Sequence, residues 1–256
     1  MARETLDLAI YLINLERSTD RRHAMEAQLR ALHLDWTVFN AVDGMQRKEE
    51  LLRFVEVKAF ERNVGRHLMP GEVGAYLSHL GVWRAFLATE KKHLLVLEDD
   101  VVFGPNFLEA IDLALQHAAS WDFLKLNKIR AKIPLMQEKI GTYHLNAYLG
   151  PATGLGAYLI SRSTAARLVD QLLPIRRPID HELDLLHVHR FRHFGLEPFP
   201  SEVKDHGVST ITGTNFKAVQ KFNTFKRLPC YLMRIKNSIF KAAHLVFNRR
   251  LKFARK

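Results

Sequence analysis

The sequence has almost no cysteine and no apolar run long enough to cross a membrane. Cys230 is the only cysteine among 256 residues, so an internal disulfide is excluded and paired-cysteine zinc or redox motifs are absent. Glu4 and Asp7 interrupt the N-terminal segment, which therefore lacks the composition of a secretory signal. No stretch reaches the roughly 20 apolar residues that a membrane span requires. We expect a cytoplasmic protein that is soluble or bound peripherally to the inner face of the membrane.

Glycine-rich phosphate loops and the zinc-protease motif are also missing. There is no GxxxxGK[ST] sequence, and residues 150–156, GPATGLG, do not match the dinucleotide-binding fingerprint. An HExxH motif starting at His181 would need a second histidine where Leu185 stands. These absences count against P-loop ATPases, kinases, nicotinamide-dependent enzymes and zinc proteases. A metal site or, as we favour, an exposed basic segment would account for the remaining histidines here, which are His187, His189 and His193.

Acidic residues are absent from His206 to the C-terminus. The formal net charge of the whole chain is +11, and this segment alone holds twelve basic residues, so the rest of the chain is close to −1 (11 minus 12). The positive charge is therefore a property of the tail and not of the body. The twelve residues are Lys217, Lys221, Lys226, Arg227, Arg234, Lys236, Lys241, Arg249, Arg250, Lys252, Arg255 and Lys256.

The body has the composition and patterning of an α/β domain. Hydrophobic residues make up 47% of the chain, enough for a large core. Short apolar runs alternate with amphipathic helical segments, as in an α/β sandwich. We predict strands at residues 8–15, 36–42, 93–97, 122–127 and 157–161, and helices at 20–32, 47–61, 72–89, 107–119 and 163–173. The predicted organisation is a domain over residues 1–212 and a tail over 213–256.

The sharpest motif is an acidic triplet directly after an apolar strand. In LLVLEDDVVF, residues 94–103, four apolar residues precede Glu98, Asp99 and Asp100. Buried carboxylates need a cation, a basic partner or exposure at the strand end. Ligands collect at the carboxyl ends of strands in open α/β sheets, and an all-oxygen site favours Mg²⁺ or Mn²⁺ completed by a diphosphate. The alternative is an acidic turn paired with lysine or arginine.

Two other segments place polar residues beside predicted strands. In PGEVGAYLSHLGVW, residues 70–83, a helix carries a Ser-His pair, which is more often structural than catalytic. In NLERSTDRR, residues 14–22, an amide and arginines follow the first strand, where they would contact a base, a ribose or a phosphate, or form a solvated helix face.

Taken in order, these motifs resemble glycosyltransferase family 25, the lipooligosaccharide galactosyltransferase family that also includes the collagen galactosyltransferases. The matching segments cover roughly residues 8–212. They are YLINLERSTDRR, NAVDG, GEVGAYLSHLGVW, LLVLEDDVVF, WDFLKLN, GLGAYLISRSTAARL, PIDHELD and PFPSEV followed by STI. The resemblance implies a GT-A fold, which is a Rossmann-like α/β/α sandwich.

The same resemblance implies an inverting transfer of a sugar, most commonly galactose from UDP-galactose, onto a bacterial lipooligosaccharide or lipopolysaccharide. It makes the acidic triplet a DxD-like element for Mn²⁺ or Mg²⁺ and the nucleotide sugar. The implied metal ligands are Glu98 and Asp100. His206 is a further candidate by analogy with the C-terminal histidines of several other GT-A enzymes. The implied donor contacts are Asn14, Arg17, Arg21, Glu72, Ser78, His79, Glu98 and Asp99.

An inverting transfer also needs a carboxylate that takes the proton from the acceptor hydroxyl. Asp180 in the PIDHELD segment is the first candidate for this base, followed by Glu182 and then Asp184. One departure from the family pattern is Thr210 in STI, where an aspartate is expected. If that acidic residue contacts a substrate, specificity differs in this chain.

The tail predicts a basic amphipathic helix over residues 228–250. Lysines and arginines lie beside its apolar stripe and would attract anionic lipid head groups, which brings the enzyme to a glycolipid acceptor. The alternative is a helix that packs on the body through the same stripe. The stripe consists of Leu232, Ile235, Ile239, Ala243 and Val246.

Three other functions compete with the transferase. The positive charge suggests nucleic-acid binding, but the body is neutral and contains no recognised DNA or RNA module, so we expect no nucleic-acid partner. Clustered carboxylates also occur in metal-dependent nucleases and phosphoesterases, which usually recruit ligands from several strands. A non-catalytic, membrane-bound partner of another transferase is the third possibility, and the intact acidic triplet counts against it.

Overall fold

The computed structural model describes residues 7–204 and 220–254, and the side chains of the last helix up to residue 247. His206, Thr210 and the predicted domain boundary after residue 212 lie outside the described residues.

An eight-stranded mixed sheet forms the centre of the protein, with the strand order β2-β1-β3-β10-β5-β11-β8-β7. Strands β10 and β8 run against the direction shared by the other six. The strands are β1 (Leu8–Asn14), β2 (Thr37–Asn40), β3 (His93–Glu98), β5 (Phe123–Lys125), β7 (Pro134–Ile140), β8 (Tyr143–Tyr148), β10 (Ala157–Ser161) and β11 (His193–Glu197). The carboxyl ends of β1 and β3 therefore meet at one edge.

Two short ladders form separate two-stranded sheets. Strand β4 (Val101–Phe103) pairs with β12 (Ser201–Val203), and β6 (Arg130–Ala131) pairs with β9 (Ala152–Thr153). The β4 strand continues the chain directly after the acidic triplet, and the turn between β3 and β4 holds the two aspartates. The triplet thus occupies the strand end, as predicted.

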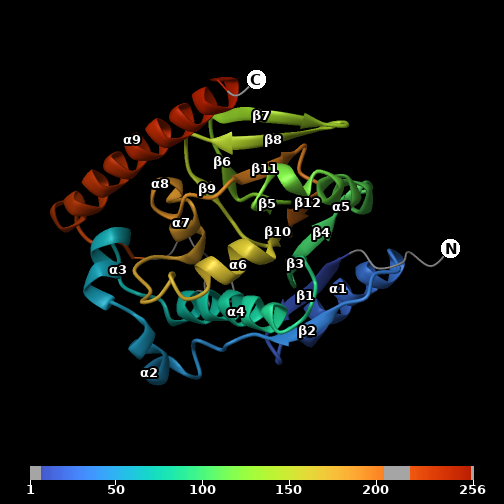
Figure 1. Cartoon of the computed structure of the whole chain (residues 1–256). Coiled ribbons are helices and arrows are strands. Elements are labelled where there is room, and N and C mark those ends of the chain that lie inside the picture. Colours follow the sequence, from blue (N-terminus) through green and yellow to red (C-terminus); the bar gives the residue numbers. More distant parts are fainter. Residues whose placement is uncertain (1–6, 205–219, 255–256) are drawn as a thin grey trace.

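Helices cover both faces of the sheet (Figure 1). The chain moves one way from β1 to β2 and the other way from β2 to β3, so right-handed crossovers place the intervening helices α1 and α4 on opposite faces. The helices are α1 (Thr19–Ala31), α2 (Lys48–Leu51), α3 (Val57–Val64), α4 (Pro70–Leu87), α5 (Phe107–Gln116), α6 (Arg162–Leu168), α7 (Ile179–Leu183), α8 (Leu186–His189) and α9 (Thr224–Ala254), with 3-10 turns at Leu52–Phe54 and Ala118–Ser120.

The core explains why β3 forms where it does. Leu94, Leu95, Val96 and Leu97 are all fully buried between β1 and β10. A strand in the middle of a sheet covered on both faces is apolar on both sides, so its sequence is a continuous run and does not alternate. Helix α4 packs against β1, β2 and β3 and contributes Trp83 and Phe86 to the same core.

The predicted helix over residues 47–61 is wrong, because it breaks at Val55. Here the backbone pairs with a distant segment: Glu56 N donates to Ile175 O at 3.0 Å, and Ile175 N donates to Phe54 O at 2.8 Å. This tertiary pairing replaces the helical hydrogen bonds between α2 and α3. The prediction also missed the β7–β8 hairpin and β11, whose sequences lack a long apolar run.

Helix α9 docks along the body of the protein, beside α3 and α8 (Figure 1). Its contacts are made by the face that carries Cys230, Lys241 and Leu245, all of which are buried. The apolar stripe predicted from the sequence lies elsewhere on the helix and is exposed at Leu232 and Ile239. In the described ranges, no helix combines the length and apolar character that a bilayer crossing takes.

Candidate active site

Asp99 is held by residues from the first strand and first helix. The parallel register pairs Ile13 with Glu98, so Asn14 stands level with Asp99. The Asn14 side chain is 2% exposed, and its amide donates to Asp99 Oδ2 at 2.6 Å and to Ser18 O at 3.1 Å. Arg21 donates to the other oxygen of Asp99. Burial raises the pKa of Asp99, while Arg21 and Asn14 oppose this rise.

The Asp100 carboxylate has fewer hydrogen-bond and ion-pair partners than the Asp99 carboxylate. Its Oδ2 lies 3.3 Å from Arg21, but its Oδ1 is buried and finds no hydrogen-bond partner among the described residues. Burial, reinforced by the nearby charge of Glu98, raises the pKa of Asp100 to about 7. A buried, incompletely paired carboxylate of this kind is stabilised by a cation.

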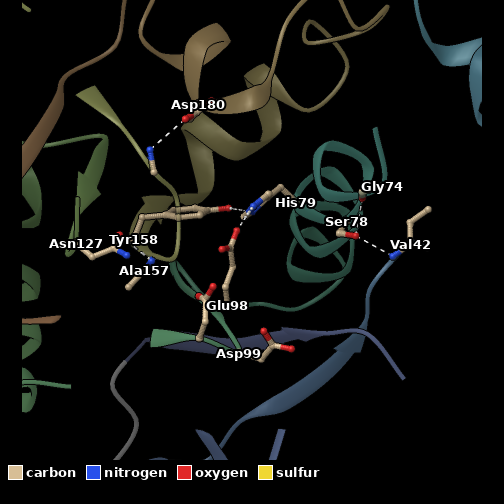
Figure 2. A network of polar contacts seen from close by, with 12 residues as sticks. Val42, Gly74, Ser78, His79, Glu98, Asp99, Asn127, Ala157, Tyr158 and Asp180 are labelled. Atoms are coloured by element: carbon tan, nitrogen blue, oxygen red, sulfur yellow. Dashed lines mark hydrogen bonds and ion pairs between the residues drawn. The ribbon is translucent and has the colours of Figure 1, made fainter. Parts of the chain in front are cut away.

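Glu98 belongs to a chain of hydrogen bonds that runs into the core (Figure 2). His79 Nε2 lies 3.1 Å from Glu98 Oε1, and His79 Nδ1 lies 2.9 Å from Tyr158 Oη. Trp83 Nε1 donates to the same Tyr158 oxygen at 2.9 Å. The His79, Trp83 and Tyr158 side chains are buried, so each of these polar atoms depends on its partner.

The donor and acceptor roles in this chain follow from the two outer groups. The indole of Trp83 can only donate, so the Tyr158 oxygen accepts from it and directs its own hydrogen to His79 Nδ1. Burial raises the pKa of Tyr158 well above its usual value, so the hydroxyl keeps this hydrogen. His79 then carries its proton on Nε2 and donates it to Glu98. The network fixes the position of the Glu98 carboxylate.

The other two residues predicted on α4 lie away from the triplet. Ser78 donates to Gly74 O at 2.7 Å and accepts from Val42 N at 2.8 Å, so it ties α4 to the loop after β2 (Figure 2). Glu72 is buried and receives both terminal nitrogens of Arg66. The structure therefore brings His79 to the triplet but not Ser78 or Glu72.

Arg17 also lies apart from the acidic triplet. It forms an ion pair with Asp43 in the NAVDG segment, and its side chain is about half exposed. Asp43 in turn accepts from the backbone of Met45 at 3.0 Å. Arg17 stays accessible to a ligand at the end of β1.

The predicted acceptor-side carboxylates lie on and after helix α7. Asp180 Oδ2 accepts from Gly154 N at 3.1 Å, and Oδ1 accepts from His181 N at 2.8 Å. Figure 2 shows Asp180 on a helix separate from the strand that carries Glu98. Because both of its partners are backbone amides, no basic side chain neutralises Asp180 through a direct contact in the described structure.

Glu182 is more strongly engaged than Asp180. Its oxygens bind His189 Nε2 at 2.9 Å and Arg177 at 2.8 Å. Burial would raise the pKa of Glu182, but the hydrogen bond from His189 and the charge of Arg177 outweigh it and hold the pKa below its usual value. A carboxylate stabilised in this way is a weak proton acceptor.

Asp184, the third candidate base, takes part in a buried charge cluster. Lys241 of α9 donates to Asp184 Oδ1 at 2.6 Å and to Gly150 O at 2.8 Å. Lys125 at the end of β5 is 1% exposed and donates to Ala152 O at 3.2 Å. Burial lowers the pKa of Lys125 to about 8, although Asp180 and Asp184 oppose this fall.

Sequence reasoning missed Tyr158, Trp83, Lys125 and Asn127. Asn127 is fully buried, its Oδ1 accepts from Ala157 N at 3.1 Å, and its Nδ2 has no partner within the part of the chain that the structure describes. These residues stand in segments already noted, SHLGVW, WDFLKLN and GLGAYL. For Lys125 and Tyr158, the available signal was a polar residue inside an apolar strand.

No complete metal centre forms from protein groups alone in residues 7–204 and 220–254, since no three His, Cys, Asp or Glu side chains are placed to hold an ion. The residues present still fit a divalent cation of the magnesium type. Such ions are commonly bound by one or two carboxylates and complete their shell with water and substrate phosphates. The partnerless oxygen of Asp100 and the fixed carboxylate of Glu98 match that donor set.

The geometry defines a carboxylate site at the carboxyl edge of a mixed α/β sheet, with Arg21 beside it. The chain belongs to glycosyltransferase family 25, because the model of that family, described as "Glycosyltransferase family 25 (LPS biosynthesis protein)", matches residues 7–183. The family resemblance drawn from the motifs is thus confirmed.

Several curated relatives show the same similarity. A glycosyltransferase 25 family member of Aedes aegypti is 31% identical over 186 residues, which are 69% of this chain and 30% of the relative. Procollagen galactosyltransferase 1 of Danio rerio is 25% identical over 211 residues, 74% of this chain and 35% of the relative. The human inactive glycosyltransferase 25 family member 3 is 29% identical over 184 residues, which are 65% of this chain and 31% of the relative. The chain spans about a third of the length of these relatives.

Two solved structures resemble the chain distantly. Protein A197 from STIV is 11% identical with a TM-score of 0.37 and covers 73% of this chain and 80% of its own. Mouse xyloside xylosyltransferase 1, apo form, is 15% identical with a TM-score of 0.32, and the match covers 73% of this chain and 64% of the mouse chain.

Proposed function

We propose that the protein is an inverting glycosyltransferase of the GT-A type that binds a nucleotide sugar at the acidic triplet. The observation that carries this proposal is Asp100, a buried carboxylate at the carboxyl edge of the sheet, one oxygen of which has no hydrogen-bond partner among the described residues. Membership of glycosyltransferase family 25 supports the same reaction class.

Glu98 and Asp100 would hold Mn²⁺ or Mg²⁺ together with the diphosphate of the donor. The bound ion would supply positive charge that stabilises the departing nucleoside diphosphate. The chain's own part is to fix the ligands beforehand: His79 orients Glu98, and Arg21 is shared between Asp99 and Asp100. Preorganised ligands of this kind need no rearrangement during the reaction.

On the donor side, Asn14 and Arg21 act through Asp99, which they hold in place. Arg17 is the exposed basic residue beyond β1 and would contact a phosphate or ribose of the nucleotide. Ser78 and Glu72 support this side indirectly, since they fix the start of α4 and its contact with the loop after β2. His206 is retained as a candidate metal ligand from the sequence alone.

Asp180 is the proposed general base. An inverting transfer needs a carboxylate that accepts the proton of the acceptor hydroxyl while that oxygen bonds to the anomeric carbon. Among the described residues, the hydrogen-bond partners of Asp180 are backbone amides, whereas Glu182 is neutralised by His189 and Arg177. We therefore expect Asp180→Asn to abolish transfer with little change in donor binding, and Glu182→Gln to act mainly on stability.

The donor sugar and acceptor are proposed from the family. Galactose from UDP-galactose is supported by the name of the zebrafish relative, a procollagen galactosyltransferase. A lipooligosaccharide or lipopolysaccharide acceptor is supported by the family description, which names lipopolysaccharide biosynthesis. With such an acceptor, the enzyme would act peripherally at the inner face of a bacterial cytoplasmic membrane.

The test is nucleotide release from a panel of UDP-sugars in the presence of Mn²⁺. Release that prefers UDP-galactose and falls by about 100-fold or more in Asp100→Asn supports the proposal. The matched control is Asp35→Asn, since Asp35 is exposed and remote from the triplet in sequence. An unchanged rate in Asp100→Asn contradicts the assigned site. Phosphoester or nucleic-acid cleavage without nucleotide-sugar turnover would support a phosphoesterase instead.

A further inference from the structure

Helix α9 has two faces of different character. One face docks on the body through Cys230, Lys241 and Leu245, which are buried. Arg227, on the same side, packs its side chain over Gly65 after α3. The helix is thus fixed to the domain, and its orientation relative to the body is set by these contacts.

The opposite face carries a continuous row of exposed apolar side chains. With about 100° between successive residues, Leu232 lies about 180° around the helix from Lys241. The members of the row are between 48% and 89% exposed. They are Phe225, Leu228, Leu232, Ile235, Ile239 and Val246. An apolar row of this length facing away from the protein marks an interaction surface.

The charges around this row select the partner. The helix contains no Asp or Glu, and its exposed charged residues up to position 247 are Lys226, Arg234 and Lys236. Of these, Lys236 lies about 40° around the helix from Leu232 and flanks the row, whereas Lys226 and Arg234 lie toward the docked side. The sequence adds five basic residues from Arg249 to Lys256. A second copy of α9 would therefore meet the first with charges of the same sign, which disfavours pairing. An anionic surface is complementary.

We propose that this outward row, residues 225–246 of α9, lies in the head-group region of an anionic lipid bilayer with the helix parallel to the membrane plane. Apolar side chains enter the boundary between head groups and acyl chains, and Lys236 beside the row contacts the lipid phosphates. The inference names the surface for the proposed membrane location and does not depend on the sugar that is transferred.

The test uses vesicle co-sedimentation of the full chain with point variants. The perturbing variant is Ile235→Gln with Ile239→Gln, two row residues that are 58% and 62% exposed. The matched control is Met45→Gln with Met136→Gln, equally exposed apolar residues (58% and 55%) outside α9. Vesicles contain either phosphatidylcholine alone or phosphatidylcholine with phosphatidylglycerol. Deletion of the tail is unsuitable, because it would also remove Lys241.

We expect binding to the anionic vesicles that weakens with added salt, falls by about tenfold or more in the Ile235/Ile239 variant and is unchanged in the control. UDP release with a soluble acceptor should be the same in all three proteins, which separates this inference from the proposed activity. Equal vesicle binding by the variant and the wild type would overturn the inference. So would dimerisation of the wild type that the Ile235/Ile239 variant abolishes.

Discussion

Removing the Lys241 ammonium should expose the energetic role of the contact between α9 and the body. Lys241 and Asp184 are 2.6 Å apart, and their side chains are only 5% and 20% exposed. Lys241→Met keeps the aliphatic length of the side chain but leaves the Asp184 carboxylate buried without its cation. It also removes the donor to Gly150 O.

The expected cost is about 3 kcal/mol in the free energy of unfolding, which is typical for breaking one partner of a buried ion pair. Replacing both partners is much less costly, because no unpaired charge remains. The double variant Lys241→Met with Asp184→Leu should therefore recover about 2 kcal/mol of this loss. In a domain of this size, about 3 kcal/mol corresponds to a fall of roughly 6–12 °C in Tm.

The loss should also depend on pH. Burial raises the pKa of Asp184 in the folded protein, and Lys241 opposes this rise. Without Lys241 the folded pKa moves further above the unfolded value near 3.8, so the folded variant binds more protons than the unfolded chain. The variant then loses stability as pH rises above the unfolded pKa of Asp184. The difference in unfolding free energy between Lys241→Met and the wild type should therefore be larger at pH 8 than at pH 5.

Urea denaturation followed by circular dichroism measures these differences. The control is Lys236→Met, an exposed lysine on the same helix, which should change stability by less than about 0.5 kcal/mol. A cost below about 1 kcal/mol for Lys241→Met, or no recovery in the double variant, would refute the assignment of Lys241 and Asp184 as a buried pair.

Three more predictions concern the acidic edge of the sheet. Asp100→Asn should abolish UDP release. The same substitution should raise Tm by a few degrees at pH 8, because burial disfavours the ionised carboxylate. A lower Tm would contradict a buried, poorly compensated Asp100. Tyr158→Phe removes the hydrogen bond to His79 Nδ1. It should weaken Mn²⁺ binding, measured by calorimetry, without unfolding the protein. Unchanged affinity would show that His79 does not need the hydrogen bond from Tyr158. Gly156→Ala should destabilise the protein by about 2 kcal/mol in thermal unfolding, since its Cβ would lie 2.5 Å from Asn127 Nδ2. Unchanged stability would mean that residue 156 and the Asn127 side chain lie further apart.

The sequence allowed prediction of the strands whose apolar runs are continuous, and of the position of the triplet after β3. Such runs report burial directly, so β1, β3 and β10 were located within a residue or two. The β7–β8 hairpin was missed because its outer strand is largely solvent-facing and mixes polar with apolar residues. The break at Val55 could not be foreseen, since its cause is pairing with Ile175, 120 positions away.

In the site, too, contacts between neighbouring predicted strands could be predicted from the sequence, whereas contacts between distant segments could not. The position of Asp99 beside Asn14 follows from two parallel strands that are both visible in the sequence. The partner of His79, by contrast, is Tyr158, separated from it by 79 positions. Motif order indicated that both segments matter, but only the folded structure shows that His79 and Trp83 of α4 meet Tyr158 of β10 in one hydrogen-bond chain.

Strand β10 enters the sheet against the direction of its neighbours, and this reversal has an evolutionary consequence. Its first residues meet the last residue of β3, where Glu98 N donates to Gly156 O at 2.7 Å. The edge is thus built from an early stretch, residues 8–103, and a later one, residues 150–193, that come together only in space. For an enzyme of the proposed kind, mutation in the later stretch can change the acceptor while the earlier stretch keeps the donor. Lineages that diverge in acceptor should accordingly accumulate their substitutions between residues 150 and 193.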